Sequence, residues 1–188
     1  MRVTELASGL LREKVSEGDV AIDATAGRGR DTLLLATLVG ASGRVHAFDV
    51  QPEAIESTRS LLKQFGVDER CALHLRCHSE MTAALPVENR GKVAAVVFNL
   101  GYLPGSDHAV TTSPATSGKA LRSAMDMLQA GGRLICVCYT GHPGGEEESD
   151  AVVALARSAE QEGWRVSLSG HEPGSGRPWV ACLDRGLV

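Results

Sequence analysis

The sequence predicts an α/β fold, a Rossmann-like and mostly parallel seven-stranded sheet with helices on both faces and an antiparallel C-terminal strand. Three observations indicate this. Short apolar runs alternate with segments of helical periodicity along the chain. The first run ends in an acidic residue and a glycine-bearing turn, residues 23–29, before a helical segment begins. Polar residues also follow several later runs, as they do where parallel sheets bind ligands at the carboxyl ends of their strands.

Each element follows from its local pattern. The first segment places apolar residues at helical spacing, which predicts an amphipathic helix on the sheet edge or over a ligand. Pro52 suits a helix start, and Gly66 suits a helix end. We expect one domain, 1–188, with helices over 3–15, 30–39, 52–65, 113–128 and 146–162. We expect strands over 19–24, 44–49, 71–76, 93–98, 133–139, 164–169 and 178–184, the last two forming an antiparallel hairpin.

Composition excludes several functional classes. Hydrophobic residues make up 43% and charged residues 22%, as in ordinary globular domains. Aromatic residues make up only 4%, which argues against a broad platform for stacking single-stranded bases. The net charge of −4 gives no general attraction to nucleic acid, so an RNA substrate requires a local basic patch. Arg28, Arg30, Lys119 and Arg122 are candidates for it, or are ordinary solvated charges.

The cysteines and the hydropathy pattern predict a cytoplasmic protein. The five cysteines are odd in number and include no C-x-x-C pair, so we expect reduced thiols and neither a zinc site nor a disulfide scaffold. His74, Cys77 and His78 are close in sequence but straddle a strand end, so we expect no metal. No apolar run approaches the roughly 20 residues of a membrane span, and we expect neither secretion nor membrane attachment.

The turn after the first strand indicates the kind of ligand. Gly27-x-Gly29 is followed by Thr32 where a dinucleotide-binding loop has its third glycine, and no P-loop motif occurs. Asp23 before the turn suggests a partner with an amino group. Asp49, which ends the second strand, suggests a ribose diol. An amino group and a ribose together indicate S-adenosylmethionine (SAM); the alternative is a plain glycine turn with acids that cap helices.

A second informative stretch follows the fourth strand at residues 99–104. The Asn99 side chain and nearby carbonyl groups can accept hydrogen bonds from an amine and orient its lone pair toward a methyl sulfonium. Methyl transfer is an in-line displacement, so positioning supplies much of the catalysis. The amine must be neutral, because an ammonium ion has no lone pair. The alternative for Asn99 is a residue that only forms the turn after a strand.

Taken together, these segments resemble one family. They are Asp-Ala-Thr-Ala-Gly-x-Gly-x-Asp-Thr at 23–32, Ala-Phe-Asp-Val-Gln at 47–51, His78-Ser79, Asn-Leu-Gly-Tyr-Leu-Pro-Gly-x-Asp at 99–107, and Tyr-x-Gly-His-x-Gly-Gly-x-Glu at 139–147. They are similar to the class I SAM-dependent methyltransferases of the rRNA methylase family over about residues 1–165. The resemblance implies an RNA-directed methyltransferase that modifies the amine of 5-aminomethyl-2-thiouridine at the tRNA wobble position.

The resemblance also implies roles for individual residues. Those expected to hold the methionine part of SAM are Asp23, Thr25, Gly27, Gly29, Asp31 and Thr32. Asp49 and Gln51 would hold the ribose and the adenine side, His78 and Ser79 would line the adenine pocket, and Asn99 and Leu100 would lie beside the methyl group. The entrance for the target nucleoside would be shaped by Tyr102, Asp107, Thr112, Thr116 and His142. Asn99, Tyr102 and His142 are the candidate catalytic residues, His142 by removing a proton from the amine.

The chain departs from the family in two places. Members usually carry Asn and His where this chain has Arg28 and Arg30; two cations beside a sulfonium suggest that they face the SAM carboxylate or an RNA phosphate. The segment 174–179 lacks the expected Asn followed by Pro-rich sequence. The alternatives are methylation of rRNA or of a small amine metabolite, and a non-catalytic nucleotide-binding domain. A homodimer also stays open.

Overall fold

The chain folds around one twisted sheet, seen in a computed structural model that describes residues 2–101 and 114–187. The strands are β1 (Val20–Asp23), β2 (Arg44–Asp49), β3 (Cys71–Leu75), β4 (Val93–Leu100), β5 (Leu128–Cys138), β6 (Arg165–Ser169) and β7 (Trp179–Asp184). Their order across the sheet is β3-β2-β1-β4-β5-β7-β6. Neighbouring strands pair in parallel from β3 to β5, whereas β7 runs antiparallel to both β5 and β6. The predicted fold class and the antiparallel C-terminal hairpin are confirmed.

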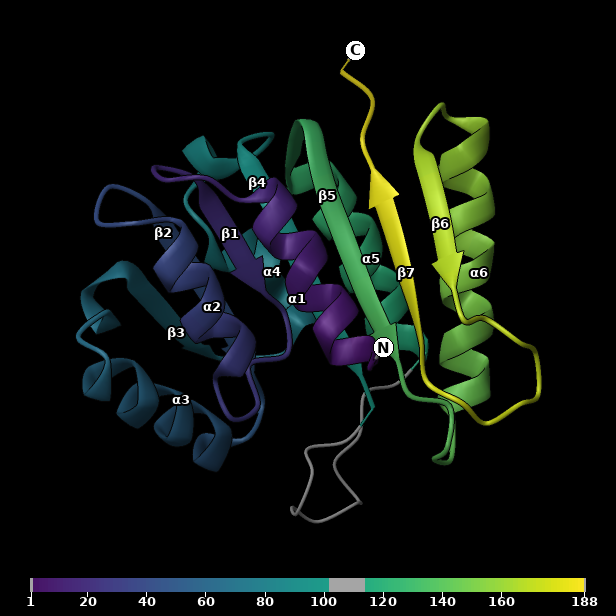
Figure 1. The fold of residues 1–188 in the computed structure, drawn as a ribbon, viewed down its shortest axis with the longest axis horizontal. Helices are drawn as coiled ribbons and strands as arrows, with labels where there is room; N and C mark the ends of the chain where they lie inside the picture. Colours follow the sequence, from purple (N-terminus) through teal and green to yellow (C-terminus); the bar gives the residue numbers. More distant parts are fainter. Residues whose placement is uncertain (1, 102–113, 188) are drawn as a thin grey trace.

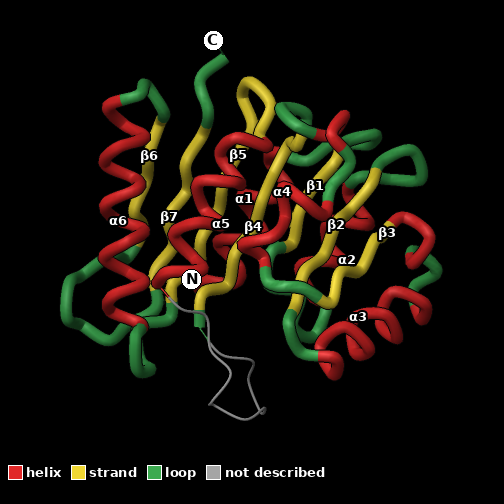
Figure 2. Tube along the Cα trace, turned by 180° about the vertical axis from the view of Figure 1, so that it is seen from behind, coloured by secondary structure: helices red, strands yellow, loops and turns green. Residues whose placement is uncertain are grey.

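Helices cover both faces of this sheet. They are α1 (Val3–Lys14), α2 (Arg30–Leu38), α3 (Pro52–Gln64), α4 (Met81–Ala84), α5 (Pro114–Met127) and α6 (Gly145–Gln161). Figure 1 shows α1, α2 and α3 in front of the sheet, and Figure 2 shows α5 and α6 from the opposite side. None of the described helices combines the length and apolar character needed to cross a bilayer.

The two faces of β4 explain how the sheet is buried. Val96 and Phe98 point into the apolar cluster formed with α5 and α6, while Ala95 and Val97 point into the cluster formed with α1 and α2. Residues Val93–Phe98 are buried without interruption. A central parallel strand covered on both faces requires such an unbroken apolar run, because neither set of alternating side chains meets water.

Most element boundaries differ from the sequence-based expectation by one or two residues; β4, for example, extends to Leu100 and so includes Asn99, and the start of the fifth strand differs by more. The fifth strand was expected to begin at Arg133, but β5 begins at Leu128, directly after α5. The pairing with β4 shifts register between Val93 and Ala95, so that the strand absorbs extra residues, including Gly131 with φ of 72°. A bulge of this kind has no apolar signature. Similarly, the segment after β3 contains the short helix α4 rather than only a loop.

A cluster of polar side chains links β2 and β3 to the segment that precedes β4. The Nδ1 atom of His46 lies 3.2 Å from Nε2 of His74, and the Asn89 amide lies 3.3 Å from Nε2 of His46. The amide donates to Nε2, so the His46 proton resides on Nδ1 and is donated to His74. Phe48 stacks on His74 with ring centroids 4.5 Å apart. Burial, assisted by the neighbouring His74, lowers the pKa of His46 to about 4.

We expect this cluster to make the protein acid-sensitive. The unfolded chain takes up a proton at His46 near pH 6.5, whereas the folded chain resists protonation until about pH 4. Stability from neutral His46 is therefore complete above pH 6.5 and is lost as the pH falls toward 4. The free energy of unfolding falls by at most about 3 kcal/mol over this pH range. Urea unfolding of wild type and His46→Gln between pH 4 and 7 measures it; a constant difference between them across that range would contradict the prediction.

Candidate functional site

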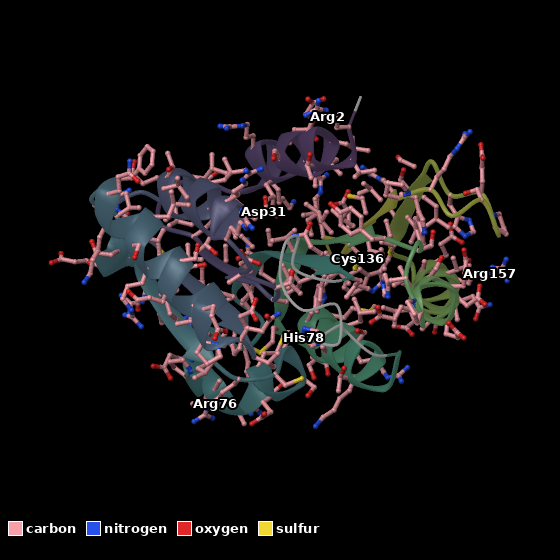
Figure 3. The ribbon with its side chains drawn as sticks, turned by 90° about the horizontal axis from the view of Figure 1, so that it is seen from below. Arg2, Asp31, Arg76, His78, Cys136 and Arg157 are labelled. Atoms are coloured by element: carbon pink, nitrogen blue, oxygen red, sulfur yellow. The ribbon has the colours of Figure 1, made fainter. Side chains whose placement is uncertain are left out.

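A large cavity opens at the carboxyl edge of the parallel strands. Its volume is about 1170 Å³, and the described residues around it come from the carboxyl ends of β1 to β5 and the segments that follow them, from α1, and from the loop between β6 and β7. Figure 3 looks onto this edge and shows Asp31 and His78, which follow different strands. The carboxyl ends of parallel strands meet at one edge, so segments far apart in sequence converge there.

The glycine turn brings backbone close to the second strand. The Gly27 N–H donates to a carboxylate oxygen of Asp49 over 2.9 Å, and the Gln51 N–H donates to the other oxygen over 3.0 Å. Gly29 adopts φ of 79° and a Cβ atom there would lie 2.9 Å from Cα of Thr58 on α3. The turn therefore requires glycine at this position for both its conformation and its close packing. Asp49 is held in place and lines the cavity.

Asp23 has a different position from the one expected. Its side chain is fully buried, and it is not among the described residues that line the cavity. The carboxylate accepts hydrogen bonds from the Thr32 hydroxyl over 2.6 Å and from the Thr25 N–H over 3.1 Å. Burial and the nearby Asp31 carboxylate raise the pKa of Asp23. Asp23 thus ties the end of β1 to the first turn of α2 beneath the cavity.

Asp31, in the first turn of α2, is the carboxylate that faces the cavity on this side. It accepts a hydrogen bond from the Asn99 side-chain amide over 2.8 Å. The Asn99 backbone N–H donates to the Thr25 hydroxyl over 2.7 Å. Burial raises the pKa of Asp31, and the Asn99 donor opposes the shift. Since a carboxylate only accepts, the amide nitrogen of Asn99 faces Asp31 and its oxygen is turned elsewhere.

His78 presents a buried acceptor on the other side of the cavity. Its Nδ1 atom lies 3.2 Å from the Ala24 carbonyl oxygen, which fixes the proton on Nδ1. The side chain packs edge-on against Phe98 and the residue is only 7% exposed. Burial lowers the pKa of His78, so the ring is neutral and its Nε2 atom is an acceptor. Within the described part of the chain this Nε2 atom has no hydrogen-bond partner. A ligand N–H or O–H group fits it.

A second histidine lies beside a buried acid. His142 follows β5 and lines the cavity, and its Nε2 atom lies 4.0 Å from a carboxylate oxygen of Glu148 on α6. Glu148 is 2% exposed and accepts a hydrogen bond from the Ser117 hydroxyl of α5. The His142 Nδ1 atom lies 3.0 Å from the Pro143 carbonyl oxygen. The imidazole of His142 and the carboxylate of Glu148 thus lie at the outer limit of an ion-pair distance.

Comparison with known proteins identifies the family. The family model described as "Putative rRNA methylase" matches residues 45–178. The chain belongs to this family.

This member of the rRNA methylase family resembles a named plant protein. It is 41% identical over 171 residues to an Arabidopsis thaliana protein named tRNA (mnm(5)s(2)U34)-methyltransferase, chloroplastic. The match covers 87% of this chain but only 62% of the length of the plant protein.

Two crystal structures resemble the whole chain. One is a "putative rRNA-methylase" from Clostridium thermocellum, with 34% identity, a TM-score of 0.88, and coverage of 98% of this chain and 97% of that one. The other is a "putative methyltransferase" from Streptococcus mutans in complex with SAH, with 32% identity, a TM-score of 0.85 and coverage of 98% of both chains.

The structure brings together many, though not all, of the residues predicted for the site in this family member. Those that line the cavity are Thr25, Gly27, Asp31, Asp49, Gln51, His78, Asn99, Thr116 and His142. Those not among the described lining residues are Asp23, Gly29, Thr32, Ser79 and Leu100. Tyr102, Asp107 and Thr112 lie outside the described residues.

Sequence reasoning missed part of the cavity wall. Thr4, Ser8 and Arg12 of α1 line it, as do Phe48 and Tyr139. The polar residues of α1 gave no signal beyond amphipathicity, although a helix over the ligand was one of two placements considered. Tyr139 directly follows β5 and belongs to the motif at 139–147, but no role in the site was expected for it. His74 and Cys77 form no metal site with a third ligand in the described ranges.

We expect the free acceptor of His78 to contribute to nucleoside binding. His78→Asn keeps an amide donor near the position of Nδ1, for the Ala24 carbonyl, but removes the Nε2 acceptor. The dissociation constant for S-adenosylhomocysteine should rise about tenfold, the loss of one buried hydrogen bond. Isothermal titration measures it. His74→Asn, which alters a histidine not among the described lining residues, is the control; equal affinities in wild type and His78→Asn would contradict the role.

Proposed function

We propose that this protein is a SAM-dependent N-methyltransferase that methylates the aminomethyl group of 5-aminomethyl-2-thiouridine at the tRNA wobble position. One observation carries the proposal: Asp49 at the end of β2 and the Asp31–Asn99 pair, which joins α2 to β4, face the same cavity. The named activity of the plant relative and the SAH bound to the Streptococcus mutans relative support it.

The residues present fit the cofactor. Asp49 has lone pairs left for a ribose diol, since each of its oxygens accepts a single backbone hydrogen bond. The buried Nε2 of His78 suits an N–H or O–H group of the adenosine. Asp31, rather than Asp23, is placed to meet the ammonium group of the methionine part. When bound, SAM supplies an electrophilic methyl group on a sulfonium.

Asn99 is the group that we assign to the acceptor amine. The amide nitrogen of Asn99 donates its hydrogen bond to Asp31, so the side-chain oxygen of Asn99 is available to accept an N–H from the amine. This contact aims the amine lone pair without adding a competing nucleophile. Alignment of a neutral amine in this way is the main catalytic contribution that the chain can make to an in-line displacement.

The cavity is large enough to hold a second ligand beside the cofactor. Its volume of about 1170 Å³ exceeds the roughly 300–1,000 Å³ of pockets for one small ligand, leaving room for a nucleoside beside the cofactor.

Methylation transfers the positive charge from sulfur to nitrogen, and the product amine then releases a proton. His142 is the residue we assign to this proton, because it lines the cavity and lies beside the Glu148 carboxylate.

A reducing compartment such as the cytoplasm suits this proposal. The five cysteines are free thiols, and burial raises the pKa of Cys71 to about 11, which keeps it protonated and unreactive.

Nucleoside analysis tests the function directly. Purified protein and SAM are incubated with bacterial tRNA that carries the unmethylated aminomethyl nucleoside, and the digested tRNA is examined by mass spectrometry. We expect one added methyl group on that nucleoside. Ribosomal RNA and a panel of small amines are run beside it. Methylation of either in place of tRNA, or SAM binding without any methyl transfer, would overturn the proposed substrate or the proposed activity, respectively.

A further inference from the structure

Arginines are concentrated around the cavity, although the chain as a whole is acidic. The described lining residues include four arginines, Arg12, Arg28, Arg30 and Arg76, but no lysine and only three acids. All four arginines are exposed, whereas the net charge of the chain is −4. Two of the acids, Asp31 and Asp49, already accept hydrogen bonds inside the site. The wall of the cavity is therefore locally basic.

Three of these guanidinium groups make no close ion pair with an acid among the described residues, although Asp31 interacts electrostatically with Arg30 at longer range. Among the described side chains, no carboxylate oxygen lies within 4.0 Å of the guanidinium nitrogens of Arg12, Arg30 or Arg76. Arg28 already has a partner within the chain. Arg30 also begins α2, where the helix dipole disfavours a cation. Helix stability thus does not explain the presence of arginine at position 30.

The three arginines are too widely distributed to serve one small anion. Arg30 follows β1, Arg76 follows β3, and β2 lies between these strands. Strand ends two places apart are separated by about 10 Å. Arg12 comes from α1, a different part of the wall. Figure 3 shows Arg76 well away from Asp31, the neighbour of Arg30. This spread over separate elements suits a chain of phosphates better than the single carboxylate of SAM.

The geometry points to Arg12, Arg30 and Arg76 as a docking surface for the phosphate backbone of the RNA that enters the cavity. This inference rests on the proposed function and adds the place where the substrate is held. Arginine suits the task because its planar guanidinium matches two phosphate oxygens at once. Contacts to phosphate position an RNA without reading its sequence, so these side chains bring the target nucleoside to the cavity and the cavity itself selects the base.

Salt-dependent RNA binding tests this surface. Binding of unfractionated bacterial tRNA is measured for wild type, for each single variant and for the triple variant Arg12→Ala/Arg30→Ala/Arg76→Ala, in the presence of S-adenosylhomocysteine. Each lost phosphate contact should reduce the slope of log affinity against log salt by about 0.7–0.9. The slope for the triple variant should therefore fall by about 2.1–2.7, and its tRNA affinity should fall at least about tenfold. Its affinity for S-adenosylhomocysteine should stay within about twofold of wild type.

Arg157→Ala is the matched control, since Arg157 is an exposed arginine on α6 that Figure 3 shows apart from the other labelled arginines. It should bind tRNA as wild type does. A triple variant with the wild-type salt slope overturns the docking surface, even if wild type methylates tRNA. A loss of S-adenosylhomocysteine affinity with unchanged tRNA binding also overturns it and assigns the arginines to the cofactor carboxylate. If wild type neither binds nor methylates tRNA, the proposed function fails together with this surface.

Discussion

Replacing Asn99 with alanine should reduce kcat for methyl transfer about 100-fold while cofactor affinity changes by less than about threefold. The side chain links Asp31 to the acceptor, and its backbone N–H bond to Thr25 does not depend on the side chain. The loss therefore falls on alignment of the amine rather than on the fold. Single-turnover transfer of labelled methyl groups to tRNA measures kcat, and isothermal titration measures affinity.

Two further variants give this prediction its controls. Asn89→Ala removes a similar side chain that is not among the described lining residues, so it should lower stability slightly and leave kcat unchanged. Asp31→Asn lets the amide of Asn99 turn over, because position 31 then donates as well as accepts. We expect a loss of kcat in that variant too. Retention of wild-type kcat in Asn99→Ala would show that the amine is aligned by other groups.

Replacing Asp49 with alanine should weaken binding of S-adenosylhomocysteine about 100-fold. Hydrogen bonds to a charged acceptor contribute about 1.5–3 kcal/mol each, and a ribose diol would lose two of them. Asp49→Ala also releases the N–H groups of Gly27 and Gln51, so the turn that faces the cofactor becomes less ordered. Isothermal titration against the wild type measures the change in dissociation constant, and circular dichroism checks the fold.

Matched variants separate the two contributions to this loss. Asp49→Asn keeps an oxygen that can accept one of the backbone hydrogen bonds, so its affinity for S-adenosylhomocysteine should fall only about tenfold. Asp19→Ala is the control, because the Asp19 carboxylate also accepts a backbone N–H, from Ser16, but lies just before β1 at the amino end of the strand. It should bind S-adenosylhomocysteine normally. Equal affinities for wild type and Asp49→Ala would remove the assigned ribose site.

Topology made the convergence of Asp49 and Asn99 predictable. Both residues end apolar runs, and parallel strands bring such ends to one edge, so no knowledge of side-chain contacts was needed. The position of Asp23 was not predictable in the same way. The residue also ends a strand, but the Thr32 hydroxyl draws its carboxylate beneath the loop. A contact of this kind depends on the path of the turn, which the residue types alone do not determine.

Other features could not be predicted from the sequence, because they depend on how helices and strands pack against one another. The cover provided by α1 arises because its polar side faces the carboxyl edge, and an amphipathic pattern does not say which neighbour a helix packs on. The early start of β5 depends on a register shift opposite β4. The roles of Tyr102, Asp107 and Thr112 stay predictions, because these residues lie outside the described part of the chain.

The placement of α1 has a practical consequence for work with the protein. Because Thr4, Ser8 and Arg12 help to enclose the cavity, a purification tag fused ahead of residue 2 is attached next to the opening where the substrate would arrive. The last described residues lie at the opposite end of the molecule (Figure 1). A tag fused there leaves the opening accessible, so assays and inhibitor screens are better run on protein tagged at the C-terminus.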